Sequence, residues 1–405
     1  MPQTLVRLAL LCLMFLAQTA SPGVADTLAL VGATVYHSPT AAPIRDAVVV
    51  ASDGVITAIG PRSDVQVPKD ARVIDCAGKA IVAGFWNSHV HFTEPVWNSA
   101  AGGPAAPLEK HMQDMLTRWG FTTVWDIGSN PANSVPLRRR IEAGEIRGPR
   151  IFLVGSLFPK GGHPVYLPPE AQLPMAATPE EAARMTGGYM QMGADGLKLF
   201  TGSFMGAKPV VNMDAAIAKA ATDVAHAQGK MVFAHPQNRA GVDAVLAARV
   251  NVLAHTIPTE PGYTSEQLSL FKSQGTALVP TLALWTNVVR EPAITERLVA
   301  SGVAQLKASA ANGGVVLFGT DVGFTQLYDT TLELEFMRRA LPAGEVLASL
   351  TTGPASYFKA EKKGRVETGF DADLAVIDGD PIADVRNLAK VAYTIRAGRI
   401  IYQRP

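Results

Sequence analysis

Two histidines stand one residue apart in "GFWNSHVHF", residues 84–92, directly after an apolar run. On a β-strand, residues i and i+2 point to the same face, so the rings of His89 and His91 would face the same way. Imidazole nitrogens placed like this can hold a divalent metal ion. The pair alone favours a simpler interpretation, two polar residues where a strand reaches solvent, because H-x-H arises often by chance.

Four more residues with chemical potential lie in or at the end of apolar runs. They are Lys198 in "GLKLFTG", His235 in "MVFAHP", His255 in "NVLAHTI" and Asp321 in "VVLFGTDVG". Each is a weak signal alone, because a histidine that closes a strand is usually a hydrogen-bonded structural residue. Together with His89 and His91 they predict one shared site, provided that the runs end at the same place in the fold.

Lys198 allows two kinds of chemistry. An unpaired ammonium inside an apolar strand is costly, so this lysine must be neutral, paired or modified. It could be a Schiff-base nucleophile, although that option leaves the four histidines without a role. It could also be carboxylated by CO₂, and the two oxygens of the carbamate could bridge two divalent cations.

The elements that would position these residues alternate regularly along the chain. Apolar strand-like runs are separated by Ala- and Leu-rich helical stretches, such as residues 213–230. We count eight runs, over residues 81–90, 122–128, 150–158, 196–202, 231–236, 251–257, 277–284 and 315–323. Eight strand–helix units predict an α/β fold, a (β/α)₈ TIM-type barrel, whose active-site residues lie at the carboxyl ends of the strands. An open doubly wound sheet is not supported, because no G-x-G-x-x-G follows the first strand.

Both ends of the chain have a different texture. Short β-branched runs broken by Gly and Asp-Gly turns occupy the region before residue 83 and return after residue 370. We therefore predict a small β-sandwich domain built from residues 26–82 and 359–405. The predicted barrel would occupy residues 83–358.

The composition restricts the partners. Hydrophobic residues make up 48% of the chain and charged residues 18%, which favours a large core over long disorder. The 36 basic and 35 acidic residues leave a net charge of +1, so nothing favours nucleic acid or an anionic membrane surface. The expected partner is a small-molecule substrate, and the sequence leaves a homo-oligomer open.

Residues 1–25 have the pattern of a signal peptide. Arg7 precedes an apolar segment, residues 8–17, and the small residues Gly23 and Ala25 suit cleavage after Ala25. Cleavage would remove Cys12 and leave Cys76 alone, so no internal disulfide is expected. The sequence thus predicts a periplasmic or secreted protein that is free of the membrane after cleavage.

The six-residue pattern resembles the amidohydrolase superfamily: H-x-H after strand 1, Lys on strand 4, His after strands 5 and 6, and Asp after strand 8. The motifs "GADGLKLF", "GKMVFAHPQN" and "GFDADLAVIDGDP" are similar to the imidazolonepropionase-related group, which includes metal-dependent Xaa-Pro and acyl-amino-acid dipeptidases. The resemblance covers nearly the whole chain after the signal peptide.

The resemblance implies a binuclear centre. His89, His91 and Asp321 would hold one divalent ion, and His235 and His255 the other. Carboxylated Lys198 and a hydroxide would bridge the two ions, and histidines with carboxylates suit Zn²⁺. Asp321 would also be catalytic, moving a proton from the attacking hydroxide to the leaving group. The expected function is an exported amidohydrolase that cleaves a C–N bond in a small substrate such as a dipeptide or an N-acyl amino acid.

Two departures from the family pattern bear on the substrate. Deaminases of the superfamily carry Glu three residues after the strand 5 histidine, whereas this chain has Asn238, which argues against deamination. The dipeptidases follow that histidine with Ala-Tyr-Gly, and here residues 236–238 are Pro-Gln-Asn, which puts a dipeptide substrate in question. The alternatives are an ester or lactone hydrolase with the same centre, a catalytically silent metal-binding protein, and a Schiff-base lyase that uses Lys198.

Residues that select the substrate should lie in the loops after the strands. His163, in "FPKGGHPVY", is a second candidate catalytic residue that could donate to a substrate carbonyl or carboxylate, or it could be a solvated loop residue. Trp97, Trp285 and Phe324 follow strands 1, 7 and 8, and could form an apolar wall or belong to the core.

Overall fold

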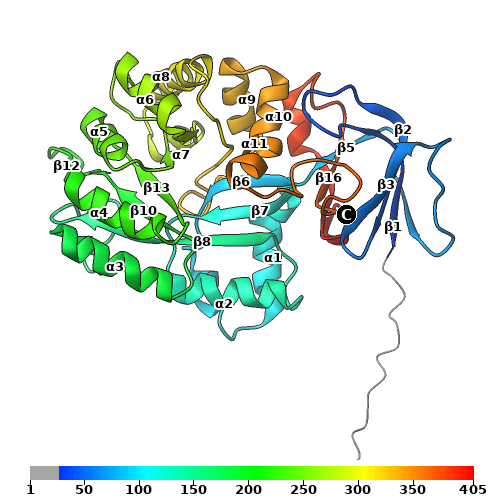
Figure 1. Cartoon of the computed structure of the whole chain (residues 1–405), viewed down its shortest axis with the longest axis horizontal. Coiled ribbons are helices and arrows are strands. Elements are labelled where there is room, and N and C mark those ends of the chain that lie inside the picture. Colours follow the sequence, from blue (N-terminus) through cyan, green and yellow to red (C-terminus); the bar gives the residue numbers. More distant parts are fainter. Residues whose placement is uncertain (1–26) are drawn as a thin grey trace, which may run out of the picture.

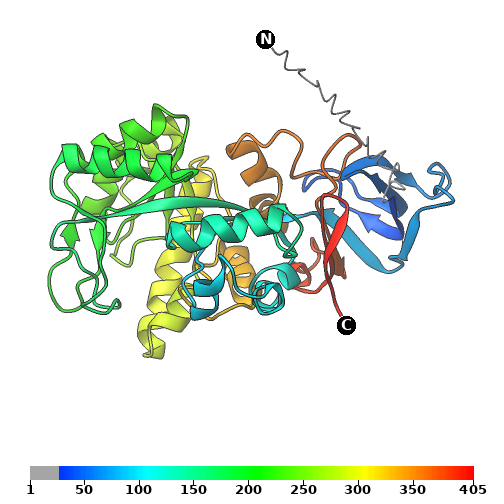
Figure 2. The same cartoon turned by 90° about the horizontal axis from the view of Figure 1, so that it is seen from below.

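A computed structural model describes residues 27–405 of the chain. The predicted signal peptide and Cys12 lie outside the described residues. The described part forms a barrel surrounded by helices, and a second sheet lies beside it at one end of the molecule (Figures 1 and 2).

The strands of the barrel are hydrogen-bonded in the order β15–β14–β13–β10–β8–β7–β6, and each neighbouring pair is parallel. They are β6 (Phe85–Val90), β7 (Phe121–Asp126), β8 (Arg150–Pro159), β10 (Gly196–Phe200), β13 (Met231–His235), β14 (Val252–Ala254) and β15 (Ala277–Val279). This nearly closed parallel sheet confirms the predicted barrel.

The eighth predicted strand, residues 315–323, closes the barrel through single bridges rather than a regular ladder. Val316 bridges to Leu278 in β15, and Val322 bridges to Val90 in β6. Asp321 has a φ of 60°, in the left-handed region, which interrupts extended backbone. The segment therefore lies between the last and first strands, although it does not form a continuous strand there.

The prediction of one strand over residues 81–90 is wrong. Ile81 belongs to β5 (Lys79–Ala83), which pairs with β1 and β16 in the other sheet, and the barrel strand β6 begins only at Phe85. Gly84 forms the corner between them, where a Cβ atom would lie 2.4 Å from Thr122 Oγ1. Both strands are almost fully buried, so the apolar pattern does not reveal the change of sheet.

Helices cover the outside of the barrel (Figure 1). They are α1 (Ala105–Met115), α2 (Pro131–Glu142), α3 (Pro179–Gln191), α4 (Ala215–His226), α5 (Arg239–Ala247), α6 (Ser265–Gln274), α7 (Leu284–Val288), α8 (Pro292–Ala311), α9 (Thr331–Ala340), α10 (Ala343–Leu350) and α11 (Thr352–Tyr357). Short 3₁₀ helices span Pro95–Ser99, Thr117–Trp119 and Val385–Ala389. Within residues 27–405, no helix combines the length and the apolar character that a membrane crossing requires.

The second sheet is mixed and joins both ends of the described chain, as predicted. Its strand order is β18–β17–β16–β5–β1–β2–β3, with β4 beside β1. The bounds are β1 (Leu28–Val35), β2 (Ile44–Ser52), β3 (Val55–Pro61), β4 (Arg72–Asp75), β16 (Leu374–Asp378), β17 (Val391–Arg396) and β18 (Arg399–Gln403). The strands share a buried cluster that includes Leu30, Val49 and Ile395, so the sheet has a core of its own.

Three short strands lie outside these two frameworks. β9 (Met175–Ala176) pairs with the end of β8, and β11 (Gly202–Ser203) pairs with β12 (Val211–Asn212) just after β10. All three belong to loops that follow barrel strands. They therefore lie on the side of the barrel where an active site would be expected.

Candidate metal centre

Five of the six predicted ligands lie at the carboxyl ends of the barrel strands or in the bridging segment over residues 315–323, and Lys198 lies in the middle of β10. His89 is in β6 and His235 ends β13, whereas His91 and His255 directly follow β6 and β14. Asp321 lies in the segment that bridges β15 and β6. Five of the six are buried, with exposed fractions of 9% or less, and His235 is partly buried. Polar groups buried this deeply need partners, so their arrangement decides what the site can bind.

Three of the ligands converge on one point. The Nε2 atoms of His89 and His91 are 3.2 Å apart, and Asp321 Oδ1 lies 3.0 Å from the first and 2.8 Å from the second. One ligand atom from each residue fits within 4.8 Å of the others. Two imidazoles and a carboxylate that meet in this way form a typical site for a divalent transition metal.

His255 links this group to the remaining ligands. Its ring centroid lies 4.6 Å from that of His89 and 4.8 Å from that of His235, and its Nε2 atom is 3.8 Å from Asp321 Oδ2. Lys198 is 1% exposed, and the charge of Asp321 acts on it. The structure therefore gathers the two outer histidines around the three converging ligands.

Polar neighbours occupy one nitrogen of each outer histidine. His255 Nδ1 lies 2.6 Å from Thr281 Oγ1, and His235 Nε2 lies 3.1 Å from the side-chain oxygen of Gln237. The amide oxygen of Gln237 can only accept, so His235 Nε2 carries the proton. The free nitrogens are then His255 Nε2 and His235 Nδ1, because a partner on one ring nitrogen selects the other as the ligand.

Sequence reasoning missed Thr281, and it identified Gln237 only as a departure from the family pattern. Thr281 stands two residues beyond β15, so its place after a barrel strand was the available signal. The other departure, Asn238, is the N-cap of α5 and accepts from the backbone N–H of Gly241 at 2.9 Å. Its side chain therefore caps the N-terminus of α5.

Burial sets the protonation of the centre. It lowers the pKa of His89 to about 3 and that of His235 to about 4, and it holds the pKa of His255 well below the usual range. Burial would raise the pKa of Asp321, but the neighbouring His89 and His91 bring it well below its usual range. Neutral imidazoles and an ionised carboxylate are the forms that bind metal, so the residues fit a divalent cation.

Burial also favours the neutral form of Lys198. Burial lowers the pKa of its ammonium group to about 7, and the charge of Asp321 opposes this only in part. A large share of this lysine is therefore a neutral amine near neutral pH.

The other candidate residues occupy different surroundings. His163 lies in the loop after β8, where Nδ1 is 3.2 Å from the carbonyl of Pro164 and Nε2 is buried without a hydrogen-bond partner in the described part of the chain. Trp97 is fully buried against Phe92 and belongs to the core. Trp285 is partly buried and packs against the main core. Phe324 is 42% exposed, and its ring centroid lies 6.5 Å from that of His91.

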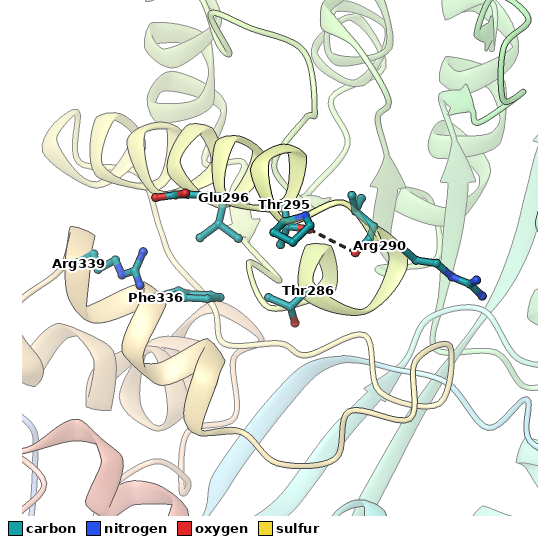
Figure 3. Close-up of a pocket in the computed structure, with 9 residues that line it drawn as sticks. Thr286, Arg290, Thr295, Glu296, Phe336 and Arg339 are labelled. Carbon is teal, nitrogen blue, oxygen red and sulfur yellow. Dashed lines mark hydrogen bonds between the residues drawn. The ribbon is translucent and has the colours of Figure 1, made fainter.

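A separate hollow of about 470 Å³ lies among α7, α8 and α9. Arg290 and Arg339 lie at its opposite ends, and Phe336 lies between them (Figure 3). None of the six predicted ligands lines it. Because the two guanidinium groups do not converge, the hollow does not compete with the buried cluster as a catalytic site.

Comparison with known proteins gives the family. The model of the amidohydrolase family matches residues 80–401, which includes the whole barrel and the last strands of the terminal sheet. The chain belongs to the amidohydrolase family. This confirms the family predicted from the sequence and, with it, the predicted class of enzyme, hydrolases that act on carbon–nitrogen bonds.

The relatives are distant. Ochratoxinase from Aspergillus niger is 24% identical over 398 residues, covering 85% of this chain and 80% of that protein. An uncharacterised protein of Mycobacterium tuberculosis is 31% identical over 177 residues, but the match covers only 40% of this chain and 44% of that protein. The chain thus matches less than half the length of its mycobacterial relative.

Solved structures share the fold over nearly the whole chain. A candidate prolidase from Bifidobacterium longum is 26% identical, with a TM-score of 0.79 over 93% of this chain and 95% of that one. A Xaa-Pro dipeptidase with bound methionine in its active site is 22% identical, with a TM-score of 0.78 over 93% of this chain. At 22% identity, the similarity to the Xaa-Pro dipeptidase shows a shared fold and no more.

Proposed function

We propose that this chain is a binuclear metal-dependent amidohydrolase that cleaves the amide bond of a small substrate such as an N-acyl amino acid or a dipeptide. The observation that carries the proposal is the convergence of His89, His91 and Asp321 on one buried point, with His255 and His235 beside it. The similarity to a candidate prolidase supports an amide substrate.

In this proposal two divalent cations, when bound, lower the pKa of water and polarise the carbonyl that is attacked. Asp321 is ionised at neutral pH, so it can accept a proton from the attacking water and pass it to the leaving nitrogen. His163 Nε2, which is buried and has no hydrogen-bond partner within residues 27–405, is a candidate donor to the substrate.

Carboxylation of Lys198 belongs to the same proposal. A neutral amine adds CO₂ to form a carbamate and releases one proton, and the low pKa of Lys198 supplies the neutral amine. The carbamate would offer two oxygens that share one negative charge, and His235, His255 and Asp321 are its charged or metal-binding neighbours. Zn²⁺ is the expected ion, because histidine nitrogens dominate the donor set.

The test is a hydrolysis screen of the zinc-reconstituted full chain against N-acyl amino acids, dipeptides and lactones, with Asp321→Asn as the inactive control. We expect release of a free amino acid from at least one amide. Hydrolysis of lactones alone would show that the centre is an esterase, and activity against none of the three classes would contradict the proposal.

We also propose that the chain is exported to the periplasm or secreted, on the pattern of residues 1–25. Expression of the complete chain in a bacterial host, followed by N-terminal sequencing of the periplasmic fraction, tests this. The proposal predicts a new terminus at Asp26. Recovery of the complete chain from the cytoplasm alone would contradict it.

A further inference from the structure

Large apolar side chains gather at the mouth of the barrel, beyond the metal ligands. We call Val165, Tyr166, Phe204 and Phe324 the apolar rim; their exposed fractions are 57%, 40%, 41% and 42%. They come from the loops that follow β8, β10 and the bridging segment at residues 315–322. Nine large apolar residues are exposed in the described chain, so the rim holds almost half of them in one place.

Contacts join the rim to the metal centre. The rings of Tyr166 and Phe324 meet edge to face, with centroids 5.1 Å apart at 70°, and Phe324 in turn lies edge to face with His91. The backbone N–H of Val165 donates to the carbonyl of Phe204 at 3.2 Å. The rim therefore begins at a metal ligand and extends outward across two other loops.

Two further observations concern the aromatic side chains around the metal centre. Partial burial raises the pKa of the Tyr166 hydroxyl, and the charge of Asp321 raises it further. At the end of β10, Phe200 stacks on His235 with centroids 5.2 Å apart. Phe158 stacks on Phe200 at 3.9 Å. Aromatic rings thus contact two of the predicted ligands, His91 and His235.

We propose that the apolar rim binds an aromatic ring of the substrate beside the scissile amide, which makes ring-bearing amides the preferred substrate class. This inference rests on the proposed function. None of the four rim residues is charged, so a carboxylate or an ammonium group of the substrate would find no ion-pair partner among them. A ring placed there would cover exposed aromatic surface, and such contacts are worth roughly tenfold in affinity.

The experiment compares amides that carry an aromatic ring with an amide that lacks one. With the zinc-reconstituted full chain, kcat/KM is measured for N-benzoylglycine and N-acetylphenylalanine against N-acetylglycine. We expect at least one ring-bearing substrate to be preferred about tenfold. In Phe324→Ala and Tyr166→Ala this ratio should fall towards one, whereas Tyr166→Phe, which keeps the ring, should retain it. Met192→Ala is the matched control, because Met192 is 52% exposed at the end of α3, away from the barrel mouth.

Saturation-transfer NMR with N-benzoylglycine and N-acetylglycine reports binding even if neither is hydrolysed. The proposal predicts transfer to the benzoyl ring that weakens in Phe324→Ala and persists in Met192→Ala. No transfer to the ring, or a ratio unaffected by both alanine variants, would overturn the rim assignment without touching the proposed function. Ring binding without any amide hydrolysis would contradict the proposed function alone.

If Phe324→Ala instead converts a dimer into a monomer and ring binding is unchanged, a second copy covers the rim and the inference is wrong.

Discussion

Asp321 combines two properties at one position. Its carboxylate meets the imidazoles of His89 and His91, and its backbone has a φ of 60°. Aspartate and asparagine adopt this left-handed conformation more readily than most other residues. The backbone requirement and the charge can therefore be separated by a single substitution.

Asp321→Asn should keep the fold and lower kcat/KM by at least about 100-fold, because the amide suits the left-handed backbone but cannot take the proton of the attacking water. Circular dichroism and the melting temperature check the fold, and steady-state kinetics check the activity. Hydrolysis at the wild-type rate would show that the proton passes through another group.

Thr281→Ala should weaken zinc binding by roughly 10- to 100-fold, because His255 loses the hydroxyl that holds its Nδ1. Thr281→Ser keeps the hydroxyl and is the matched control. Competition with a chromophoric chelator measures the affinity. Equal affinities in the alanine and serine variants would mean that the hydroxyl does not orient His255.

At the scale of elements, backbone contacts between the first and last barrel segments bring the ligands together. Asp321 N–H donates to the carbonyl of His89 at 2.9 Å, and His91 N–H donates to the carbonyl of Val322 at 2.8 Å. A Cβ atom on Gly323, where φ is 94°, would lie 1.8 Å from the carbonyl oxygen of His91. Barrel closure thus places Asp321 against a histidine pair more than 200 residues earlier in the chain.

Strand ends could be predicted because each ligand closes, or lies within, an apolar run of strand length. The corner at Gly84 could not be predicted, because β5 and β6 are both buried apolar strands. They differ in the sheet to which they belong, since β5 pairs with β16 and β6 pairs with β7. The hydrogen-bond partners of His255 and His235 could not be predicted either. Thr281 and Gln237 are common polar residues, and only the path of the loops brings them to His255 and His235.

Helix α9 supports the loop that carries Thr281. Glu333, which is 1% exposed, accepts from the backbone N–H of Ala283 at 2.7 Å, and its other carboxylate oxygen is buried without a hydrogen-bond partner among the described residues. Burial raises the pKa of this carboxyl from 4.5 to about 7, while the backbone hydrogen bonds act in the opposite direction. An ionised carboxylate at this position therefore costs stability.

Glu333→Gln should change how stability depends on pH. Between pH 4.5 and about 7 the folded state holds a proton on Glu333 that the unfolded state releases, so the contribution of this group to the free energy of unfolding falls as pH rises. The full change is on the order of 3 kcal/mol. Relative to wild type, the variant should gain melting temperature between pH 5 and pH 8. Glu335→Gln, on the same helix but less buried, is the control, and parallel curves for wild type and Glu333→Gln would contradict the assignment.

At the scale of the whole molecule, the two ends of the chain meet in one sheet, and the barrel lies between them in the sequence. β5, from the N-terminal part, pairs with β16 from the C-terminal part, and β6 follows β5 directly. The terminal sheet therefore anchors the strand that delivers His89. A metal ion bound by His89, His91 and Asp321 would form a further link between the first and last barrel segments.

Removal of metal should lower the melting temperature, because the ligands converge only in the folded chain. An ion present at about 100 times its Kd stabilises the folded state by about 2.7 kcal/mol. Scanning calorimetry before and after chelation, with zinc added back to the chelated sample, measures the effect. An unchanged melting temperature would mean that metal does not bind the folded centre more tightly than the unfolded chain.

The most direct test of the binuclear centre is the zinc content of the reconstituted and desalted full chain, measured by plasma mass spectrometry. The proposal predicts two zinc ions per chain in the wild type and a clear loss in Lys198→Ala, which lacks the proposed bridge. One ion or fewer per wild-type chain, or two ions retained in Lys198→Ala, would contradict a centre bridged by this lysine.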